Sequence, residues 1–476
     1  MSFAPKVAAV ALLVSVLAGC ASVPRDSGFG DVSRTVEAET RQPVIWDTQR
    51  PVEPSDDATV AAMLQETLTA DRAVQVAFAH NRDLQATLEE LGIARSELIA
   101  ASTIRNPLFD GEIRFPGDPK RPFVIGISQT LMDIFNLSAR KKLGRAQFEM
   151  TKLRVGGAII HFASQVRMNY YNLLAARKIL ARQDTIMKAQ EATAELAFRQ
   201  HSAGNITDLD LESEQSRYEQ VKLDQARAQL DELQARESLI ADLGLVRRAE
   251  LKLPDDFEAP PEADMEAPEV ERQAVTRRLD IRMAKQDIEA AQSAVSVAKT
   301  SAFDELSVGV HREREPEGAS TTGPAVTIPI PLFDRGAAQK TRARAMLRQA
   351  QQRLEALTVS ARSEARAAQE RLVEARSRMA YMKAVVIPRR DRILKLTQLE
   401  YNAMLSSVFQ LLEARQSLAL AQREEILATR DYWVARTELE TALLGVASFS
   451  VRPGSGEPLR PNLFEQKNQQ GKKANH

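Results

Sequence analysis

Side chains that could carry out chemistry are few in this chain and form no recognisable constellation. The five histidines are widely separated and show no metal-ligand spacing: His80, His161, His201, His311 and His476. Cys20 is the only cysteine, which excludes an intramolecular disulfide and any multi-cysteine zinc or iron–sulfur site. No Ser-His-Asp arrangement and no phosphate-binding loop emerges. The sequence therefore predicts no metal, no cofactor and no enzymatic activity.

The surroundings of Cys20 give it one chemical role. Met1–Lys6 is short and positively charged, and residues 7–18 form an unbroken apolar stretch. This order is typical of a secretory signal peptide, whose apolar stretch is too short to span the membrane in the mature protein. Residues 17–20, Leu-Ala-Gly-Cys, resemble the lipobox of bacterial lipoproteins, which implies removal of a signal peptide (1–19) and lipidation, as with palmitate, at Cys20. The alternative is an ordinary signal peptide that contains a cysteine by chance.

The residue after the cysteine indicates which membrane would hold the lipid anchor. Ala21 stands where an aspartate commonly retains lipoproteins at the inner membrane, so the resemblance implies an anchor in the outer membrane. Several acyl chains give stable anchoring, whereas one chain binds only marginally.

The elements that position any site are long helices. Lys and Arg total 64 and Asp and Glu total 64, and this balance argues against a nucleic-acid partner. There is no proline between Phe123 and Leu253, and residues 137–202 alone would extend about 100 Å as a helix at 1.5 Å per residue. Apolar residues recur every three or four positions, as expected for helices with one packed stripe. We therefore expect a bundle or a helical tube.

Four matches in the same order, each about 200 residues apart, indicate an internal duplication. They pair residues 81–84 with 278–281, 94–101 with 291–298, 131–133 with 332–334, and 243–245 with 444–446. The expected organisation is therefore a lipid-anchored extension (20–60), a first repeat (61–253), an acidic Pro-rich linker (254–269), a second repeat (270–447) and a tail (448–476).

Each repeat contains two short runs in which apolar and polar residues alternate. They are expected as strands at about 108–115, 123–131, 304–311 and 324–331. Period-two alternation over such lengths is typical of transmembrane β-barrels. Four strands cannot close a barrel, and an open sheet edge is not tolerated in lipid, so the chain must oligomerise; three copies would supply twelve strands. The alternative is a pair of hairpins in a soluble sheet.

The ordered set of segments resembles the TolC-type outer-membrane efflux proteins, in particular their OprM- and CusC-like lipoprotein branch. The resemblance spans about residues 60–447 and is carried by residues 68–107, 203–208, 323–336 (GPAVTIPIPLFDRG) and 401–416. It implies a homotrimer with a twelve-stranded barrel in the outer membrane and an α-helical tube in the periplasm. It also implies partnership with a periplasmic adaptor (membrane fusion) protein and an inner-membrane pump of the resistance-nodulation-division type. The trimer would be the passive exit duct of this tripartite efflux system.

The resemblance also assigns the turns between the long helices to the periplasmic tip. Adaptor contacts would fall on two sets of residues: Ala203, Gly204 and Asn205, and Met404, Leu405 and Ser406. The family has a glycine where this chain has Met404. The periplasmic gate would comprise Asp208, Tyr401, Gln410 and Glu413. Some members have an arginine and a second aspartate where this chain has Ser406 and Gln410, so a salt-bridged latch is in doubt and a hydrogen-bonded or hydrophobic closure is equally compatible.

Two other classes fit the sequence less well. A periplasmic adaptor should have one helical hairpin flanked by Gly-rich β segments, and a purely structural coiled-coil lipoprotein should lack the four alternating runs. The exported substrate is left open among metal ions, drugs and other small molecules.

Overall fold

A computed structural model of the chain describes residues 26–46, 63–113, 123–245, 251–315 and 319–449. The signal peptide, Cys20 and the tail from residue 450 lie outside these ranges. Within the described ranges, none of the helices has an apolar stretch long enough to cross a membrane.

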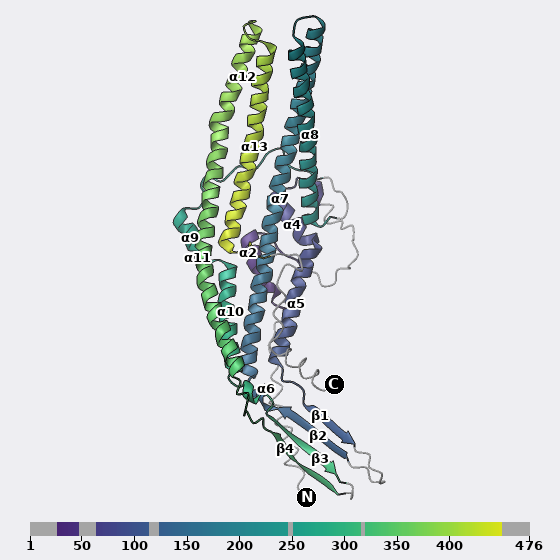
Figure 1. Cartoon of the computed structure of the whole chain (residues 1–476), viewed down its shortest axis with the longest axis vertical. Coiled ribbons are helices and arrows are strands. Elements are labelled where there is room, and N and C mark those ends of the chain that lie inside the picture. The colour runs from purple at the N-terminus through teal and green to yellow at the C-terminus, as the bar shows by residue number, and fades with distance from the viewer. Residues whose placement is uncertain (1–25, 47–62, 114–122, 246–250, 316–318, 450–476) are drawn as a thin grey trace. The chain divides into compact units, whose positions relative to one another are not determined.

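The described elements are mostly helices, with one small sheet (Figure 1). The first repeat contains α4 (Ala70–His80), α5 (Arg82–Ser102), β1 (Leu108–Ile113), β2 (Phe123–Thr130), α6 (Leu131–Phe135), α7 (Leu137–Ser202) and α8 (Asp208–Leu243). The second contains α9 (Ala267–Thr276), α10 (Leu279–Ala298), a 3-10 turn (Ser301–Phe303), β3 (Ser307–Arg314), β4 (Ser320–Thr327), α11 (Ala337–Tyr381), α12 (Ile387–Asn402) and α13 (Val408–Leu444). The expected mainly α fold with four strands is confirmed.

One helix was not expected. The segment 20–60 showed no periodicity, yet α2 (Phe29–Thr40) forms within it. Val32 and Val36 are buried, so tertiary packing stabilises this short helix.

The chain divides into two compact units, and α7 and α11 contribute to both. One unit comprises Met1–Val32, Glu89–Val155 and Asp280–Leu357 and contains the sheet. The other comprises Ser33–Leu88, Gly156–Leu279 and Thr358–His476 and contains the turns of both helical hairpins.

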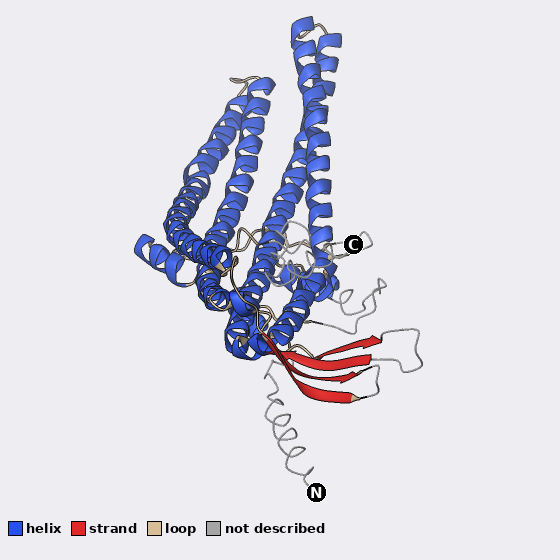
Figure 2. Cartoon of the chain, turned by 60° about the horizontal axis from the view of Figure 1, so that its bottom comes forward, coloured by secondary structure: helices blue, strands red, loops and turns tan. Residues whose placement is uncertain are grey.

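The sheet of the first unit, drawn in red in Figure 2, is antiparallel, and its strands follow the order β1-β2-β3-β4. Its register aligns Phe109, Ile127 and Val310 in one row and Asp110, Gly126 and His311 in the next. Because side chains of successive rows point to opposite faces, one face is apolar and the other is polar or small. Phe109 is 70% exposed and Ile127 58% exposed, so the apolar face is not covered within the described chain.

The second hairpin differs from its expected bounds. The strands were expected at about 304–311 and 324–331 but form at 307–314 and 320–327. The pairing of β3 with β4 extends as far as Arg314 and Ser320, and just beyond this pair Glu315 N–H donates to Ala319 O. It ends after Thr327 because Pro329 and Pro331 have no N–H to donate.

Three of the long helical stretches are interrupted at particular residues. The helical stretch before each pair of strands is interrupted, near Asn81 in the first repeat and near Arg277 in the second. A proline inside a helix kinks or breaks it, so Pro388 predicts an interruption of the long helix of the second repeat. A π-helical turn (Met382–Val386) lies just before it, and α12 then begins with Pro388 in its first turn.

The two repeats fasten their last helix in the same way. Asn81 donates through its side-chain amide to Asp242 O at 2.9 Å, in the last turn of α8. At the matching position Arg278 donates to Ala442 O at 3.0 Å, in the last turn of α13. Gly244 and Gly445 then end these helices in the left-handed conformation.

Candidate functional site

The candidate site lies at the turns of the two helical hairpins, which have the same backbone geometry. Asn205 N–H donates to Gln200 O at 2.9 Å, and Leu405 N–H donates to Glu400 O at 2.8 Å. Both turns place their second residue in the left-handed region, Gly204 at φ 76° and Met404 at φ 59°. These six-residue closures are Schellman motifs. The tips are thus structural repeats at an offset of 200 residues.

Each turn is followed by a capping box that begins the descending helix. Thr207 accepts from Asp210 N–H, and the Asp210 carboxylate accepts from Thr207 N–H at 3.1 Å. In the second hairpin Ser407 and Gln410 make the same reciprocal pair. Hydrogen bonding to Thr207 holds the pKa of the Asp210 carboxyl below its ordinary value. These caps satisfy N–H groups that would otherwise lack partners.

Asp208, a predicted gate residue, contacts the preceding helix. Its Oδ1 lies 2.6 Å from Nε2 of His201, in the last turn of α7. The Asp208 carboxylate is 93% exposed, so it remains available to solvent. The second hairpin has Tyr401 and Val408 at the equivalent positions, which cannot form an ion pair.

The other three predicted gate residues lie in the second hairpin. Gln410 accepts from the Ser406 hydroxyl at 2.6 Å as well as from Ser407 N–H, so it braces the turn. Tyr401 and Glu413 are exposed, and neither side chain has a polar partner within the described residues. No hydrogen bond or ion pair in the described chain joins Asp208 to these three residues.

The predicted adaptor-contacting residues are exposed, except Ser406, which is half-buried. Met404 is 94% exposed and Leu405 80% exposed. Ala203, Gly204, Asn205 and Ser406 occupy the rest of the two turns, and a Cβ added at Gly204 would meet nothing within 4 Å. The second tip therefore presents two unshielded apolar side chains, whereas the first presents small and polar ones.

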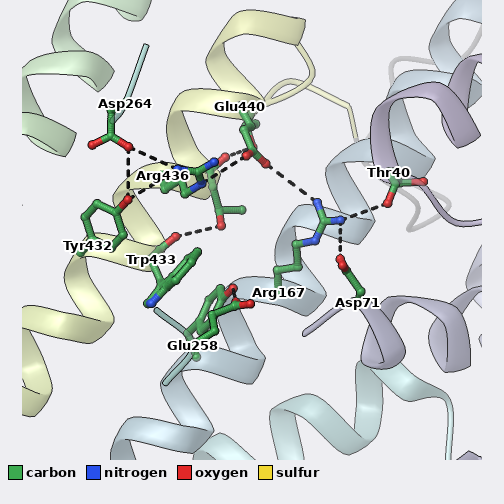
Figure 3. A network of polar contacts seen from close by, with 12 residues as sticks. Thr40, Asp71, Arg167, Glu258, Asp264, Tyr432, Trp433, Arg436 and Glu440 are labelled. Carbon is green, nitrogen blue, oxygen red and sulfur yellow. Dashed lines mark hydrogen bonds and ion pairs between the residues drawn. The ribbon is translucent and has the colours of Figure 1, made fainter. Parts of the chain in front are cut away.

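A second feature, away from the tips, is a polar network between the two repeats (Figure 3). Arg167 of α7 donates to Thr40 O at 3.1 Å and to Asp71 at 2.9 Å. It also lies 3.9 Å from Glu440 of α13. One guanidinium thus ties the first repeat to α2 and to the last helix of the second repeat.

The network continues through Asp264 in the inter-repeat linker. Its carboxylate accepts from Tyr432 and from Arg436, each at 3.2 Å, and from Arg376 at 2.8 Å. Arg436 also lies 3.7 Å from Glu440. Burial alone would lower the pKa of Arg436, but these neighbours raise it above its ordinary value.

Aromatic packing lies beside this network. The rings of Tyr171 and Trp433 stack at 5.3 Å between centroids. Tyr171 donates to Glu258 of the linker at 2.5 Å. Burial and this hydrogen bond raise the pKa of the Tyr171 hydroxyl. Trp433 and its neighbour Tyr432 are both buried, so these aromatic side chains pack in the interior of the second unit.

Sequence reasoning did not identify Glu258 and Asp264 as anchors. The linker was read only as acidic and proline-rich, and a carboxylate in such a segment gives no local sign of a partner more than 80 residues away. In the part of the chain that the structure describes, no three His, Cys, Asp or Glu side chains come together as a metal site.

The fold and the duplicated hairpins define a class of protein. The family described as outer membrane efflux protein matches residues 73–245 and 270–445. The chain belongs to this family, whose members are channels rather than enzymes. It is an outer-membrane efflux duct, and nothing supports the alternative of an adaptor-type or structural coiled coil.

Several solved structures share the fold. The Campylobacter jejuni CmeC outer membrane channel is 16% identical, with a TM-score of 0.63 over 89% of this chain and 97% of that one. CusC is 19% identical, with a TM-score of 0.64 over 84% and 98%. The open state of the Neisseria gonorrhoeae MtrE outer membrane channel is 16% identical, with a TM-score of 0.60 over 87% and 97%. No curated protein sequence matches the chain.

Proposed function

We propose that three copies of this chain form the exit duct of a tripartite efflux system. The observation that carries the proposal is the four-stranded sheet with one exposed apolar face. Strands β1 and β4 are its edges within the described chain. Because unpaired strand edges are not tolerated in lipid, β1 of one copy must pair with β4 of the next, and three copies close a ring of twelve strands.

The other parts of the proposal follow from the tips and the N-terminus. The exposed turns would receive a periplasmic adaptor that connects the duct to an inner-membrane pump of the resistance-nodulation-division type. Met404 and Leu405 would supply the apolar contacts, and Gly204 and Asn205 would allow close approach. Lipidation of Cys20 would hold the mature N-terminus at the outer membrane.

Disulfide cross-linking between edge strands tests the assembly. Single cysteines would be placed along β1 (108–113) and combined with one cysteine at Thr321 of β4. We expect at least one pair to form covalent dimers and trimers under mild oxidation in outer membranes. Pairs that replace the β1 cysteine by one at Ile127, in the central strand β2, are the matched control. Absence of cross-links from every β1 position would contradict the closed ring.

The gate proposal assigns Asp208, Tyr401, Gln410 and Glu413 to the closed tip. A ring of acidic side chains would favour cations through electrostatic focusing. We expect Asp208→Ala and Glu413→Ala to change single-channel conductance and drug susceptibility. Asp231→Ala, which removes an exposed carboxylate in the middle of α8, is the matched control. Unchanged conductance and susceptibility in both gate variants would rule out this gate.

A further inference from the structure

Basic residues cluster where the helices leave the sheet, in both repeats. Residues 137–148, at the start of α7, contain four Lys or Arg and no Asp or Glu: Arg140, Lys141, Lys142 and Arg145. Residues 335–354, which include the start of α11, contain six and again no acid: Arg335, Lys340, Arg342, Arg344, Arg348 and Arg353. The chain as a whole has equal numbers of acidic and basic residues, so this concentration is local.

The two clusters lie at the same end of the sheet. Thr130 ends β2 and Thr327 ends β4, and both align with Ser307 of β3. The segments that follow therefore emerge side by side from one end of the sheet, as the views in Figures 1 and 2 show. Both clusters belong to the same compact unit as the sheet.

Most of these cations form no ion pair with any residue that the structure describes. Arg140 is paired with Asp133, which is buried and also binds Arg105. Within the described residues, no ion pair engages Lys142, Arg145, Arg342, Arg344 or Arg348, and all five are exposed. The next acid on α7, Glu149, is already paired with Lys152.

The basic cluster of α11 lies near the N-terminus of the helix, where cations are usually disfavoured. Acidic residues are favoured in the first turns of a helix and cations are disfavoured there. Side chains on a helix lean toward its N-terminus, so the arginines of α11 lean back toward the sheet. Arg342 and Arg344 lie within about 10 Å of the helix start at 1.5 Å per residue.

Exposed apolar side chains separate the sheet from both clusters. Ile134 and Phe135 are 42% and 68% exposed in α6, and Leu332 and Phe333 are 68% and 100% exposed before α11. Each repeat thus passes from an apolar sheet face to exposed apolar side chains and then to cations. This order matches the passage from hydrocarbon to the headgroup region of a bilayer.

We propose that the basic belt, defined as Lys141, Lys142, Arg145, Arg335, Arg342, Arg344 and Arg348, binds the phosphates of anionic glycerophospholipids in the periplasmic leaflet of the outer membrane. The proposal rests on the proposed function, which puts the sheet in that membrane. Lys and Arg side chains close to an anionic membrane surface are attracted to its phosphates. The belt would therefore fix the depth of the sheet and select anionic lipid around it.

Native mass spectrometry of the purified full-length protein in detergent tests the proposal. We expect phosphatidylglycerol to bind in preference to phosphatidylcholine. The variant Arg335→Gln, Arg342→Gln, Arg344→Gln, Arg348→Gln should lose that preference by at least about tenfold. The matched control removes the same charge from α12: Arg389→Gln, Arg390→Gln, Arg392→Gln, Lys395→Gln. Inorganic phosphate at millimolar concentration should not displace the lipid.

Several results would overturn the proposal. They are no preference for phosphatidylglycerol, an equal loss in the α12 control, or displacement by inorganic phosphate, which would indicate a site for free anions. Loss of the oligomer in the belt variant would mean that these arginines face a second copy rather than lipid. Conductance of the unmodified protein, measured separately, distinguishes these failures from failure of the duct proposal.

Discussion

Tyr171 of α7 stacks on Trp433 of α13, with the rings 5.3 Å apart and 17° from parallel. The two residues belong to different repeats, and both are almost completely buried. The contact therefore fastens one half of the duplication to the other, next to the polar network on Asp264 and Arg167. These contacts therefore join the two repeats within the second unit.

Removing either partner should weaken this junction. Trp433→Ala should lower the free energy of unfolding by about 3–5 kcal/mol, because it empties a packed aromatic site. Tyr171→Phe keeps the stacking but removes the hydrogen bond to Glu258, and should cost about 1–2 kcal/mol. Denaturant titration followed by circular dichroism measures both. A double-mutant cycle of Trp433→Ala with Tyr171→Ala, which removes the second ring, reports the stacking itself, and additive effects in that cycle would contradict direct coupling of the rings.

Exchanging the residues at the left-handed positions of the two turns should change the stability of the two hairpins by different amounts. Gly204→Met should destabilise its hairpin by about 1 kcal/mol, since a side chain is strained at positive φ. Met404→Gly should have little effect or a slight stabilising one, because relief of strain is offset by the greater entropy of unfolded glycine. Local hydrogen exchange of the amides at 203–207 and 403–407 reports each turn. Equal effects of the two substitutions would contradict the shared geometry.

Arg278 should matter far more than other arginines of the second repeat. Its side chain is buried and binds Ala442 O and Glu364. Arg278→Ala should cost about 2–3 kcal/mol because it removes the hydrogen bonds that this buried cation makes to Ala442 O and Glu364. Arg366, which forms an exposed ion pair with Glu271 at 3.4 Å, is the control, and Arg366→Ala should cost less than about 1 kcal/mol. Similar losses for both would show that Arg278 does not hold the end of α13.

His161 predicts a weakness at acidic pH. Burial lowers the pKa of its imidazole from the ordinary 6.5, and its Nδ1 is buried without a partner in the described structure. Since the unfolded chain binds the proton more readily, this contribution to stability is present above about pH 6.5 and is lost as the pH falls through the folded pKa. His161→Gln should flatten the decline of the melting temperature between pH 7 and 5, and the control His311→Gln, at a half-buried position of β3, should not. An unchanged decline in His161→Gln would contradict this role.

Local sequence patterns predicted some elements well. The alternation around Phe109 and Ile127 correctly predicted a sheet with one apolar and one polar or small face. A shift of the pairing by one residue would move the apolar side chains to the other face, so the pattern also specifies the register. The absence of proline gave the length of α7. Pro388 marked the interruption of the second long helix, although not the π-helical turn that accompanies it.

Features that depend on distant partners escaped prediction. The bounds of β3 and β4 depend on their pairing within the sheet and on Pro329 and Pro331. The alternation of apolar and polar residues contains no information about either. Glu258 and Asp264 bind tyrosine and arginine side chains on helices of both repeats. No local sequence pattern predicts such contacts. The resemblance paired the two tips, but the left-handed conformation of Met404 at the glycine position could not be predicted, because methionine rarely adopts it.

Planar-bilayer recording on the purified protein tests whether the chain forms a membrane duct. We expect a trimer that resists dissociation by SDS and opens discrete, long-lived conductance steps across the bilayer. A monomer that produces no conductance would contradict the duct and the closed ring of strands.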